Sequence, residues 1–217
     1  MRTLIALGAA LVLSTSANAA VNLIVNGSFE NGVAPSGTTF LATNDTTSLP
    51  GWKVLSTGVN YIDNSVWDAS DGARSLELRT EQGNGGIVQT ISTYTAGFRY
   101  RLTFNVSANP FDPETRPKAS RVLVSASNGP VAIYAYTLNN VNTATNMLYD
   151  TVSYEFVAGN TYGNIQLRSL VSSQYGPVID NVVVTVVPEA STWAMLLAGF
   201  GLVGLASRRR NRAAVSA

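Results

Sequence analysis

One short segment of the chain places aromatic side chains next to carboxylate and amide groups. Tyr61 and Trp67 flank Asp63 and Asn64 within residues 58–72, a stretch with several turn-forming residues. Aromatic rings stack on the apolar faces of sugar rings, whereas carboxylates and amides bind sugar hydroxyls. These four residues are therefore predicted to form part of a polysaccharide-binding surface. The alternative is that Trp67 is a core residue, which is the commoner role of aromatic residues in β-sandwiches.

The inventory of reactive side chains argues against catalysis. The chain has no histidine and no cysteine, which excludes Ser-His-Asp and Cys-His nucleophiles and thiolate or imidazole metal sites. Two carboxylates could still act as acid and nucleophile, and Glu77 with Glu81 or Asp68 with Asp71 are candidate pairs. Nothing in the sequence singles out either pair, and Glu77 alternates with leucines, which predicts that it points to solvent. We therefore expect that the protein is not an enzyme.

Asp180 lies in an apolar stretch near the end of the body. Alternation places it on one strand face with the valines at positions 178, 182, 184 and 186. An ionised carboxylate on such a face is costly unless it is paired, hydrogen-bonded or bound to a metal. Two roles follow from this: Asp180 caps backbone amides in the turn around it, or it binds a cation.

The elements that must position these residues are β-strands. In YRLTFNVSA, residues 100–108, apolar residues occupy every second position, and this period of two predicts a strand with one face in the core. Further runs of this type lie at residues 21–25, 74–78, 86–91, 121–126, 131–138, 152–157, 164–171 and 178–187. Roughly nine or ten strands at this spacing predict an all-β fold, a β-sandwich of the jelly-roll type. Tyr134 and Tyr136 share one strand face and are expected to pack in the core.

Both ends of the chain carry the features of targeting signals. Arg2 precedes an apolar run at residues 4–13 and the small-residue pattern ANA at residues 17–19, which predicts a cleaved secretory signal peptide over residues 1–19. At the other end, residues 193–206 are apolar or small. As a helix they rise roughly 21 Å, against about 30 Å of bilayer hydrocarbon, so they predict a short transmembrane helix that spans only marginally.

The tail and the body differ in the sign of their net charge. Arg208, Arg209 and Arg210 follow the apolar segment, and such a cluster resists translocation. Five of the 14 basic residues are Arg2 and the arginines of the tail, so the body at residues 20–187 keeps nine basic residues against twelve acidic ones. With this balance and no basic stripe, no nucleic-acid partner is expected. The body has the size of one domain.

The tail resembles the PEP-CTERM sorting signal of Gram-negative bacteria. Val187 is followed by Pro188 and Glu189, then by Trp193 and the apolar segment, and then by the arginines. Only the third residue of the Pro-Glu-Pro-like tripeptide departs, because alanine stands there. The resemblance implies that a membrane-embedded exosortase cleaves this tail, residues 188–212. It also implies an intermediate held transiently in the inner membrane, and a final place at the cell surface or in the extracellular matrix.

The body resembles the choice-of-anchor C proteins and, more distantly, the galactose-binding-like jelly rolls of carbohydrate-binding modules. The resemblance rests on NLIVNGSFE (residues 22–30), LPGW (49–52), VNYID (59–63), WDASDGARSLEL (67–78), GIVQTIST (86–93) and YGPVIDNVVVTVVPE (175–189). In such modules an acidic residue after the first strand and an aspartate in the last strand help to bind a structural calcium ion. Glu30 and Asp180 match these positions, so the resemblance implies one structural Ca²⁺.

Export, resemblance and side-chain inventory together predict the function. We expect a non-catalytic surface or matrix protein that binds polysaccharide, including the exopolysaccharide of the matrix. The alternative is a purely structural or adhesive matrix component without a defined glycan site.

Overall fold

The fold is almost entirely β. The computed structural model describes residues 21–34, 36–80, 83–112, 114, 116, 118–126, 131–137, 142–171, 175–188 and 197–204. The strands are β1 (Thr38–Leu41), β2 (Lys53–Ser56), β3 (Val59–Asp63), β4 (Arg74–Glu77), β5 (Arg79–Thr80), β6 (Gly83–Ile91), β7 (Arg99–Ala108), β8 (Ala119–Ala126), β9 (Ala132–Thr137), β10 (Asp150–Val157), β11 (Gly163–Ser169) and β12 (Pro177–Val186). The prediction of an all-β sandwich is confirmed. Residues 197–204 form a helix, and within the described part of the chain no helix has the length and hydropathy of a membrane span.

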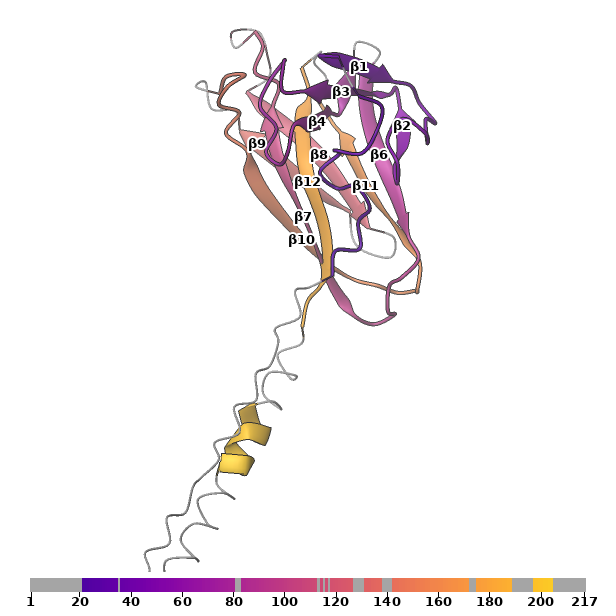
Figure 1. Ribbon diagram of the computed structural model, residues 1–217, viewed down its shortest axis with the longest axis vertical. Helices are drawn as coiled ribbons and strands as arrows, with labels where there is room; N and C mark the ends of the chain where they lie inside the picture. The colour runs from indigo at the N-terminus through magenta and orange to yellow at the C-terminus, as the bar shows by residue number, and fades with distance from the viewer. Residues whose placement is uncertain are drawn as a thin grey trace, which may run out of the picture.

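Two sheets pack face to face, with the long axis of the sandwich along the strands (Figure 1). Sheet A has the order β1-β3-β4-β12-β7-β10, and sheet B has the order β2-β6-β11-β8-β9, with β5 paired to β6. The last strand, β12, therefore lies in the middle of sheet A, between β4 and β7. The period-two prediction for residues 100–108 is confirmed, because Leu102, Phe104 and Val106 are buried while Arg101 is exposed.

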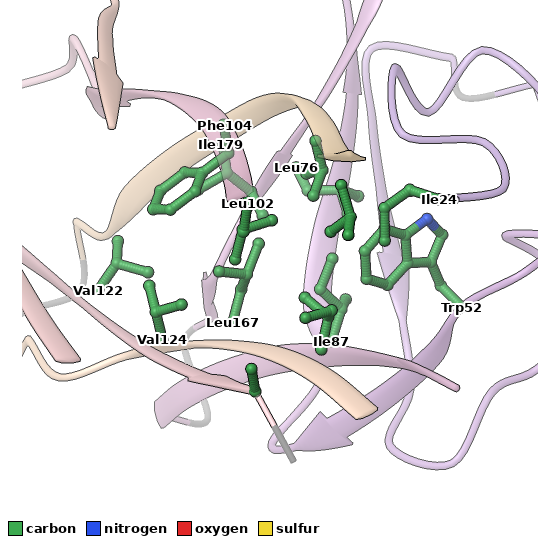
Figure 2. Close-up of a cluster of buried hydrophobic side chains, with 14 of the residues drawn as sticks. Ile24, Trp52, Leu76, Ile87, Leu102, Phe104, Val122, Val124, Leu167 and Ile179 are labelled. Carbon is green, nitrogen blue, oxygen red and sulfur yellow. The ribbon is translucent and has the colours of Figure 1, made fainter. Parts of the chain in front are cut away.

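The main core lies between the two sheets, where their apolar faces meet. Figure 2 shows Trp52 and Ile24 beside Ile87 at one side of this core, and Val122 and Val124 at the other. The side chain of Trp52 is only 2% exposed, and its Nε1–H donates a hydrogen bond of 2.9 Å to the carbonyl oxygen of Asn26. The buried ring contributes a large apolar area to the core, and the hydrogen bond removes the cost of burying its N–H group.

A β-bulge interrupts β12 and changes which side chains face the core. The register against β7 shifts between Asp180 and Val183, and Asn181 within the bulge has a φ of 49°. A bulge adds one residue to one strand and so reverses the alternation beyond it. Ile179 and Val182 consequently both face the main core, whereas Asp180 faces the opposite side of sheet A. The prediction that Asp180 shares a face with Val182 is wrong for this reason.

Loops cover the upper part of the outer face of sheet A, which we call the capped face. Residues 64–73 and 142–149 lie over it and are joined by a hydrogen bond from the N–H of Asp68 to the carbonyl oxygen of Ala144, 2.8 Å. A second apolar cluster forms beneath them from Ile62, Trp67, Met147 and Val178. The capped face is therefore a small core of its own.

The described chain enters and leaves the sandwich at the same end (Figure 1). Residues 21–25, which alternation predicts as a strand, are irregular, but they run beside β12, where the N–H of Leu23 donates to the carbonyl oxygen of Val184 at 2.8 Å. At the exit, the N–H of Val187 donates to the carbonyl oxygen of Arg99 at 2.8 Å. Both ends of the domain thus lie beside the last residues of β12.

Candidate functional site

The aromatic pair of the predicted glycan surface is buried. Tyr61 lies in β3 with no exposed surface; its hydroxyl donates to the carbonyl oxygen of Phe29 and accepts from Nη1 of Arg74 at 3.0 Å. Trp67 is 3% exposed and donates from Nε1 to Oγ of Ser75 at 2.9 Å. Neither ring offers a face to a sugar, so the prediction of an exposed stacking surface is wrong, and the core alternative for Trp67 is confirmed. The physical reason differs for the two rings: Tyr61 faces the main core from β3, whereas Trp67 is covered because its loop folds back over sheet A instead of extending into solvent.

The polar members of that segment shape its loop. Asp63 accepts hydrogen bonds from the N–H of Ser65 at 2.8 Å and from the N–H of Gly37 at 3.0 Å. The hydroxyl of Ser65, and then these two amides, hold the pKa of the Asp63 carboxyl below its usual value. The Oδ1 of Asn64 accepts from the N–H of Ala69 at 3.0 Å. Both side chains therefore tie the loop together, and their binding of a glycan stays a prediction.

Two carboxylates from distant parts of the chain hold the loop at residues 70–74, and we call this arrangement the carboxylate clamp. The Oδ2 of Asp180 accepts from the N–H and the hydroxyl of Ser70 at 2.8 and 3.0 Å, and from the N–H of Asp71 at 2.8 Å. The Oε1 of Glu30 accepts from the N–H groups of Ala73 and Arg74, each at 2.8 Å. The capping role of Asp180 is thus confirmed, although most of the amides belong to this loop and not to its own turn.

Gly72 lies between the two halves of the carboxylate clamp. Its φ is +73°, and a Cβ built on it would come within 2.5 Å of the carboxyl group of Glu30. An L side chain is therefore excluded both by the backbone conformation and by the approach of the carboxylate. Among these residues, Asp180 has no exposed surface, and burial raises the pKa of its carboxyl to about 7, although the four hydrogen bonds that it accepts act in the opposite direction.

Oxygen atoms of the carboxylate clamp that could bind a cation already accept hydrogen bonds. Oδ2 of Asp180 already accepts three hydrogen bonds, and Oε1 of Glu30 accepts two. N–H and O–H donors direct positive charge at both oxygens, whereas Ca²⁺ needs those lone pairs and six to eight oxygen ligands in total. No group of three acidic side chains forms a metal cluster within the described residues. As folded here, the two residues fit amide recognition and not a calcium cage, and Ca²⁺ at Glu30 and Asp180 stays a prediction.

The residues of the predicted sorting signal lie at the exit of the domain. Val187 is bound to β7 as described, and Pro188 is exposed. Glu189, Trp193, Arg208, Arg209 and Arg210 lie outside the described residues, as do the predicted signal peptide at residues 1–19 and parts of the predicted transmembrane helix at residues 193–206.

Sheet B turns its outer side to solvent, and we call this side the open face. Its side chains are exposed or half-buried, unlike those beneath the loops of sheet A. They are Lys53 and Leu55 of β2, Val88 and Thr90 of β6, Asn164, Gln166 and Arg168 of β11, Arg121, Leu123 and Ser125 of β8, and Ile133, Ala135 and Thr137 of β9. Amide and hydroxyl groups are well represented on this face, and the described strands place no aromatic side chain on it.

The charge of the open face has one sign. β2, β6, β8, β9 and β11 contain Lys53, Arg121 and Arg168 and no acidic residue, although the body as a whole is acidic. Lys53 pairs with Val88 of β6, which pairs in turn with Gln166 of β11. Arg168 lies two residues after Gln166 and pairs with Leu123 of β8, and Arg121 lies two residues before Leu123 on that antiparallel strand. Each basic residue is therefore displaced in the same direction from the previous one, so the three lie along a diagonal of the sheet. At a strand spacing of about 4.8 Å and a rise of about 3.3 Å per residue, the diagonal is about 20 Å long.

Arg168 occupies the middle of this diagonal. It lies opposite Gly86, where a Cβ would come within 2.6 Å of Cγ of Arg168, so glycine lets the arginine side chain lie across the neighbouring strand. Its Nε is shielded from solvent and has no hydrogen-bond partner among the described residues. The ion pairs of the described residues join Arg99 and Arg101 to Glu155 on sheet A. Arg168 takes part in no ion pair among the described residues, so its guanidinium charge is available to an external anion, although not through the shielded Nε.

A small pocket of about 90 Å³ lies at the edge of the sandwich, between β9 and β10. The rings of Tyr134 and Tyr136 line it together with Asp150. The two hydroxyls donate to carbonyl oxygens in or next to β10, of Ser153 at 2.9 Å and of Leu148 at 2.8 Å, and so join the two sheets. Both tyrosines are half-buried against the core, and the pocket is too small for a whole sugar ring.

The open face is not apparent from the order of residues along the chain. Its signal was present in the sequence, because the five strands of sheet B contain basic residues and no acidic ones. That signal becomes visible only when it is known which strands share a sheet, since β2, β6, β11, β8 and β9 are not consecutive.

Comparison with known proteins identifies relatives of this fold. The chain is similar to a family 61 carbohydrate-binding module in complex with β-1,4-galactotriose, with 13% identity, a TM-score of 0.48, and coverage of 77% of this chain and 99% of that chain. It is similar to the CBM22-1 xylan-binding domain of Xyn10C from Paenibacillus barcinonensis, with 15% identity, a TM-score of 0.44, and coverage of 81% and 100%. For an arabinose-bound GH51 α-L-arabinofuranosidase the identity is 13%, the TM-score 0.50, and the coverage 76% and 26%.

The families that match the sequence divide the chain at the end of β12. No curated protein matches it. The family described as a protein of unknown function, DUF642, matches residues 22–185, and the PEP-CTERM protein-sorting motif matches residues 186–210. The predicted sorting signal is thereby confirmed, whereas membership of the choice-of-anchor C proteins stays a prediction. The chain belongs to the DUF642 family of proteins of unknown function and carries a PEP-CTERM sorting motif directly after that domain.

Proposed function

We propose that this protein is exported, processed by an exosortase and displayed at the cell surface, where its open face binds acidic polysaccharide. The PEP-CTERM motif at residues 186–210 supports the first part, because it marks a chain for export and for membrane-anchored processing before surface display. The single observation that carries the second part is the charge of sheet B, whose strands hold Lys53, Arg121 and Arg168 and no acidic residue.

The chemistry of the open face favours an acidic glycan over a neutral one. Neutral sugars are commonly held by stacking on aromatic rings, and the described strands place no such ring on this face. Guanidinium groups instead bind carboxylates and phosphates with paired hydrogen bonds. Gln166 and Asn164, beside Arg168 on β11, add amides that bind sugar hydroxyls. The diagonal of basic residues is long enough for several sugars of an extended chain.

The same face supports a binding role without catalysis. Glycoside hydrolysis needs two carboxyl groups on either side of the scissile bond. The five strands of sheet B supply none. A polysaccharide that lies along the basic diagonal therefore contacts no carboxyl group of these strands that could act as general acid or nucleophile. Its natural source is the matrix of the Gram-negative bacterium that the tail implies.

A second function rests on the edge of sheet B. Among the described strands β9 pairs only with β8, so none of them covers its other edge, and Ile133 in β9 is 52% exposed. An open edge strand with an exposed apolar residue can pair with another chain. The second candidate is therefore a structural matrix component that associates with itself and needs no glycan.

Loss of Arg168 is expected to weaken binding to polygalacturonate roughly five- to tenfold, because a charge-assisted hydrogen bond is lost. Affinity electrophoresis of the wild type, Arg168→Gln and Arg121→Gln in gels with polygalacturonate measures this. Raising the salt from 0.05 to about 0.5 M should weaken the wild type as well, since exposed charges are screened. Dextran, which is neutral, serves as the control polysaccharide.

Arg101→Gln is the matched control protein. Arg101 is also an exposed strand arginine, but it belongs to sheet A and is paired with Glu155 at 2.7 Å. It should bind polygalacturonate like the wild type. Equal binding of dextran, or equal losses in Arg101→Gln and Arg168→Gln, would contradict the proposed site. Oligomers that form without glycan, and that Ile133→Lys removes, would support the second candidate.

Both ends of the chain are expected to be absent from the displayed protein. Mass spectrometry of protein extracted from the cell surface should find a first residue near Ala20 and a last residue near Glu189. The reason is that signal peptidase and exosortase each remove a targeting segment. An intact arginine cluster in the surface fraction would show that the tail is a permanent anchor.

A further inference from the structure

At the end of the sandwich from which the tail leaves, the described residues include two loops, residues 92–98 and 158–162, which we call the tail-proximal end. The loops are joined by backbone hydrogen bonds: the N–H of Gly97 donates to the carbonyl oxygen of Ala158 at 2.7 Å, and the N–H of Ala158 donates to that of Phe98 at 3.0 Å. A third bond joins Tyr94 N–H to the carbonyl oxygen of Thr161 at 3.1 Å. The tail-proximal end is therefore an ordered surface.

Large apolar side chains of the tail-proximal end lie in solvent. Phe98 is 50% exposed, Tyr162 is 65% exposed, and Val157, which pairs with Arg99 at the start of β7, is 44% exposed. The two loops, STYTAGF and AGNTY, contain no charged residue. An uncharged surface with exposed aromatic rings and hydroxyls is costly in water, but it matches the boundary between lipid headgroups and acyl chains, where tyrosine and other amphipathic rings gather.

The position of the tail keeps this end close to the bilayer. Val187 is bound to the carbonyl oxygen of Arg99, one residue after Phe98, and the chain leaves at Pro188 from the lower end in Figure 1. The apolar segment of the sorting motif begins at Trp193. Five residues reach at most about 18 Å when fully extended. While the tail is uncleaved and in the membrane, the tail-proximal end cannot move further than this from the lipid.

We infer that the tail-proximal end is a membrane-contacting surface, in which Phe98 and Tyr162 insert into the interface of a phospholipid bilayer while the tail anchors the chain. This inference rests on the anchoring of the PEP-CTERM tail in the proposed function. A tethered surface is already at a high local concentration, so weak insertion is sufficient to hold it. The contact orients the long axis of the sandwich away from the membrane and presents the tail at a fixed distance from the lipid. It ends when the tail is cleaved.

The absence of cysteine from the chain allows a single fluorescent label to report the contact. We would place a cysteine at Thr161, in the tail-proximal end, or at Thr145, an exposed position in the loop before β10 at the other end of that strand. The full chain carries an NBD label at either site and is reconstituted into vesicles of phosphatidylethanolamine and phosphatidylglycerol. We expect emission from position 161 to shift to shorter wavelength and its quenching by aqueous iodide to fall severalfold, with no change at position 145.

Matched variants separate insertion from general exposure. Phe98→Ser with Tyr162→Ser should return the quenching at position 161 to the level seen at position 145. Phe40→Ser is the control, because Phe40 in β1 is 47% exposed but lies at the opposite part of the sandwich, and it should leave the protection unchanged. Near-ultraviolet circular dichroism verifies that each variant is folded.

Three results would overturn the inference. Equal quenching at positions 161 and 145 in vesicle-bound chain would do so, as would protection that survives the double serine variant. If the full chain does not float with the vesicles, the anchoring by the tail fails together with this inference. If it floats and still binds polygalacturonate, but position 161 is fully quenched, only the membrane contact is lost and the proposed function stands.

Discussion

Replacing Trp67 by alanine is expected to lower the free energy of unfolding by roughly 3 to 5 kcal/mol, the usual cost of removing a buried aromatic side chain. Trp67 is the largest member of the apolar cluster under the loops of the capped face, and it is 3% exposed. Its loss leaves a cavity over Ile62 and Val178 and removes the partner of Ser75 Oγ. Urea denaturation of the purified protein, followed by near-ultraviolet circular dichroism, measures the change.

Phe111→Ala is the matched control for this measurement. The ring of Phe111 lies 5.7 Å from that of Trp67 but is 47% exposed, so its removal should cost about 1 kcal/mol or less. Binding of polygalacturonate by folded Trp67→Ala protein should be unchanged, because the open face belongs to the other sheet. A loss of binding without a loss of stability would restore Trp67 to the glycan site and contradict the structure.

The second large effect concerns pH. Stability is expected to fall as the pH rises from about 4 to about 7, and to level off above that. The folded protein holds the proton of Asp180 up to a pKa of about 7, against an ordinary value of 3.8 in the unfolded chain. The folded state therefore binds this proton more tightly, and the stabilisation that is complete below pH 4 is lost as the pH rises. A shift of this size corresponds to a change on the order of 4 kcal/mol.

Asp180→Asn identifies the source of the effect, because asparagine has the same shape and does not titrate. Urea denaturation at several values between pH 5 and 8 should give a slope for the wild type and a much smaller slope for the variant. The chain has no histidine, the side chain that ordinarily titrates in this range. Equal slopes in both proteins would assign the dependence to other groups.

The same variant, Asp180→Asn, also tests the calcium prediction when melting temperatures are compared with and without a chelator. A cation bound by Asp180 and Glu30 keeps both carboxyl groups ionised and stabilises the folded state by RT ln(1 + [L]/Kd), where [L] is the free cation concentration. Adding a chelator should then lower the melting temperature of the wild type and not that of Asp180→Asn. If the chelator has no effect on either protein, the carboxylate clamp acts through amides alone.

Alternation predicts which residues face the core where the strand itself contains no bulge. Residues 100–108 satisfy this condition, and they form β7 with the expected buried face. Asp180 shows the limit, because the bulge next to it reverses the alternation and the sequence signals this only by Asn181, a residue that tolerates positive φ. Glu77 was predicted to face solvent. It does point away from the main core, but it is 4% exposed under the loops and accepts from Asn109 and Gly176.

The candidate site was harder to predict than the strands, because it depends on contacts between distant residues. The residues around Trp67 have the composition of a sugar-binding site. Only the hydrogen bonds from Asp68 to Ala144 and from Ser70 to Asp180 show that this loop folds over the sheet and buries the ring. The open face is the proposed binding surface, and no local sequence motif indicates it. The common charge of its residues appears only after β2, β6, β11, β8 and β9 are brought together.

The central place of β12 has a consequence for the order of events during export. Sheet A cannot close without β12, because this strand joins β4 to β7, and its Asp180 reaches Ser70 across 110 residues of chain. Contacts of such long sequence separation form late, after the intervening chain has been ordered. β12 ends at Val186, which is also the first residue matched by the sorting motif at residues 186–210. Sheet A therefore cannot be completed on the outer side until β12 has crossed the membrane, and because the tail follows β12 directly, the arrival of the tail at the bilayer is also the moment at which the domain can first complete its folding.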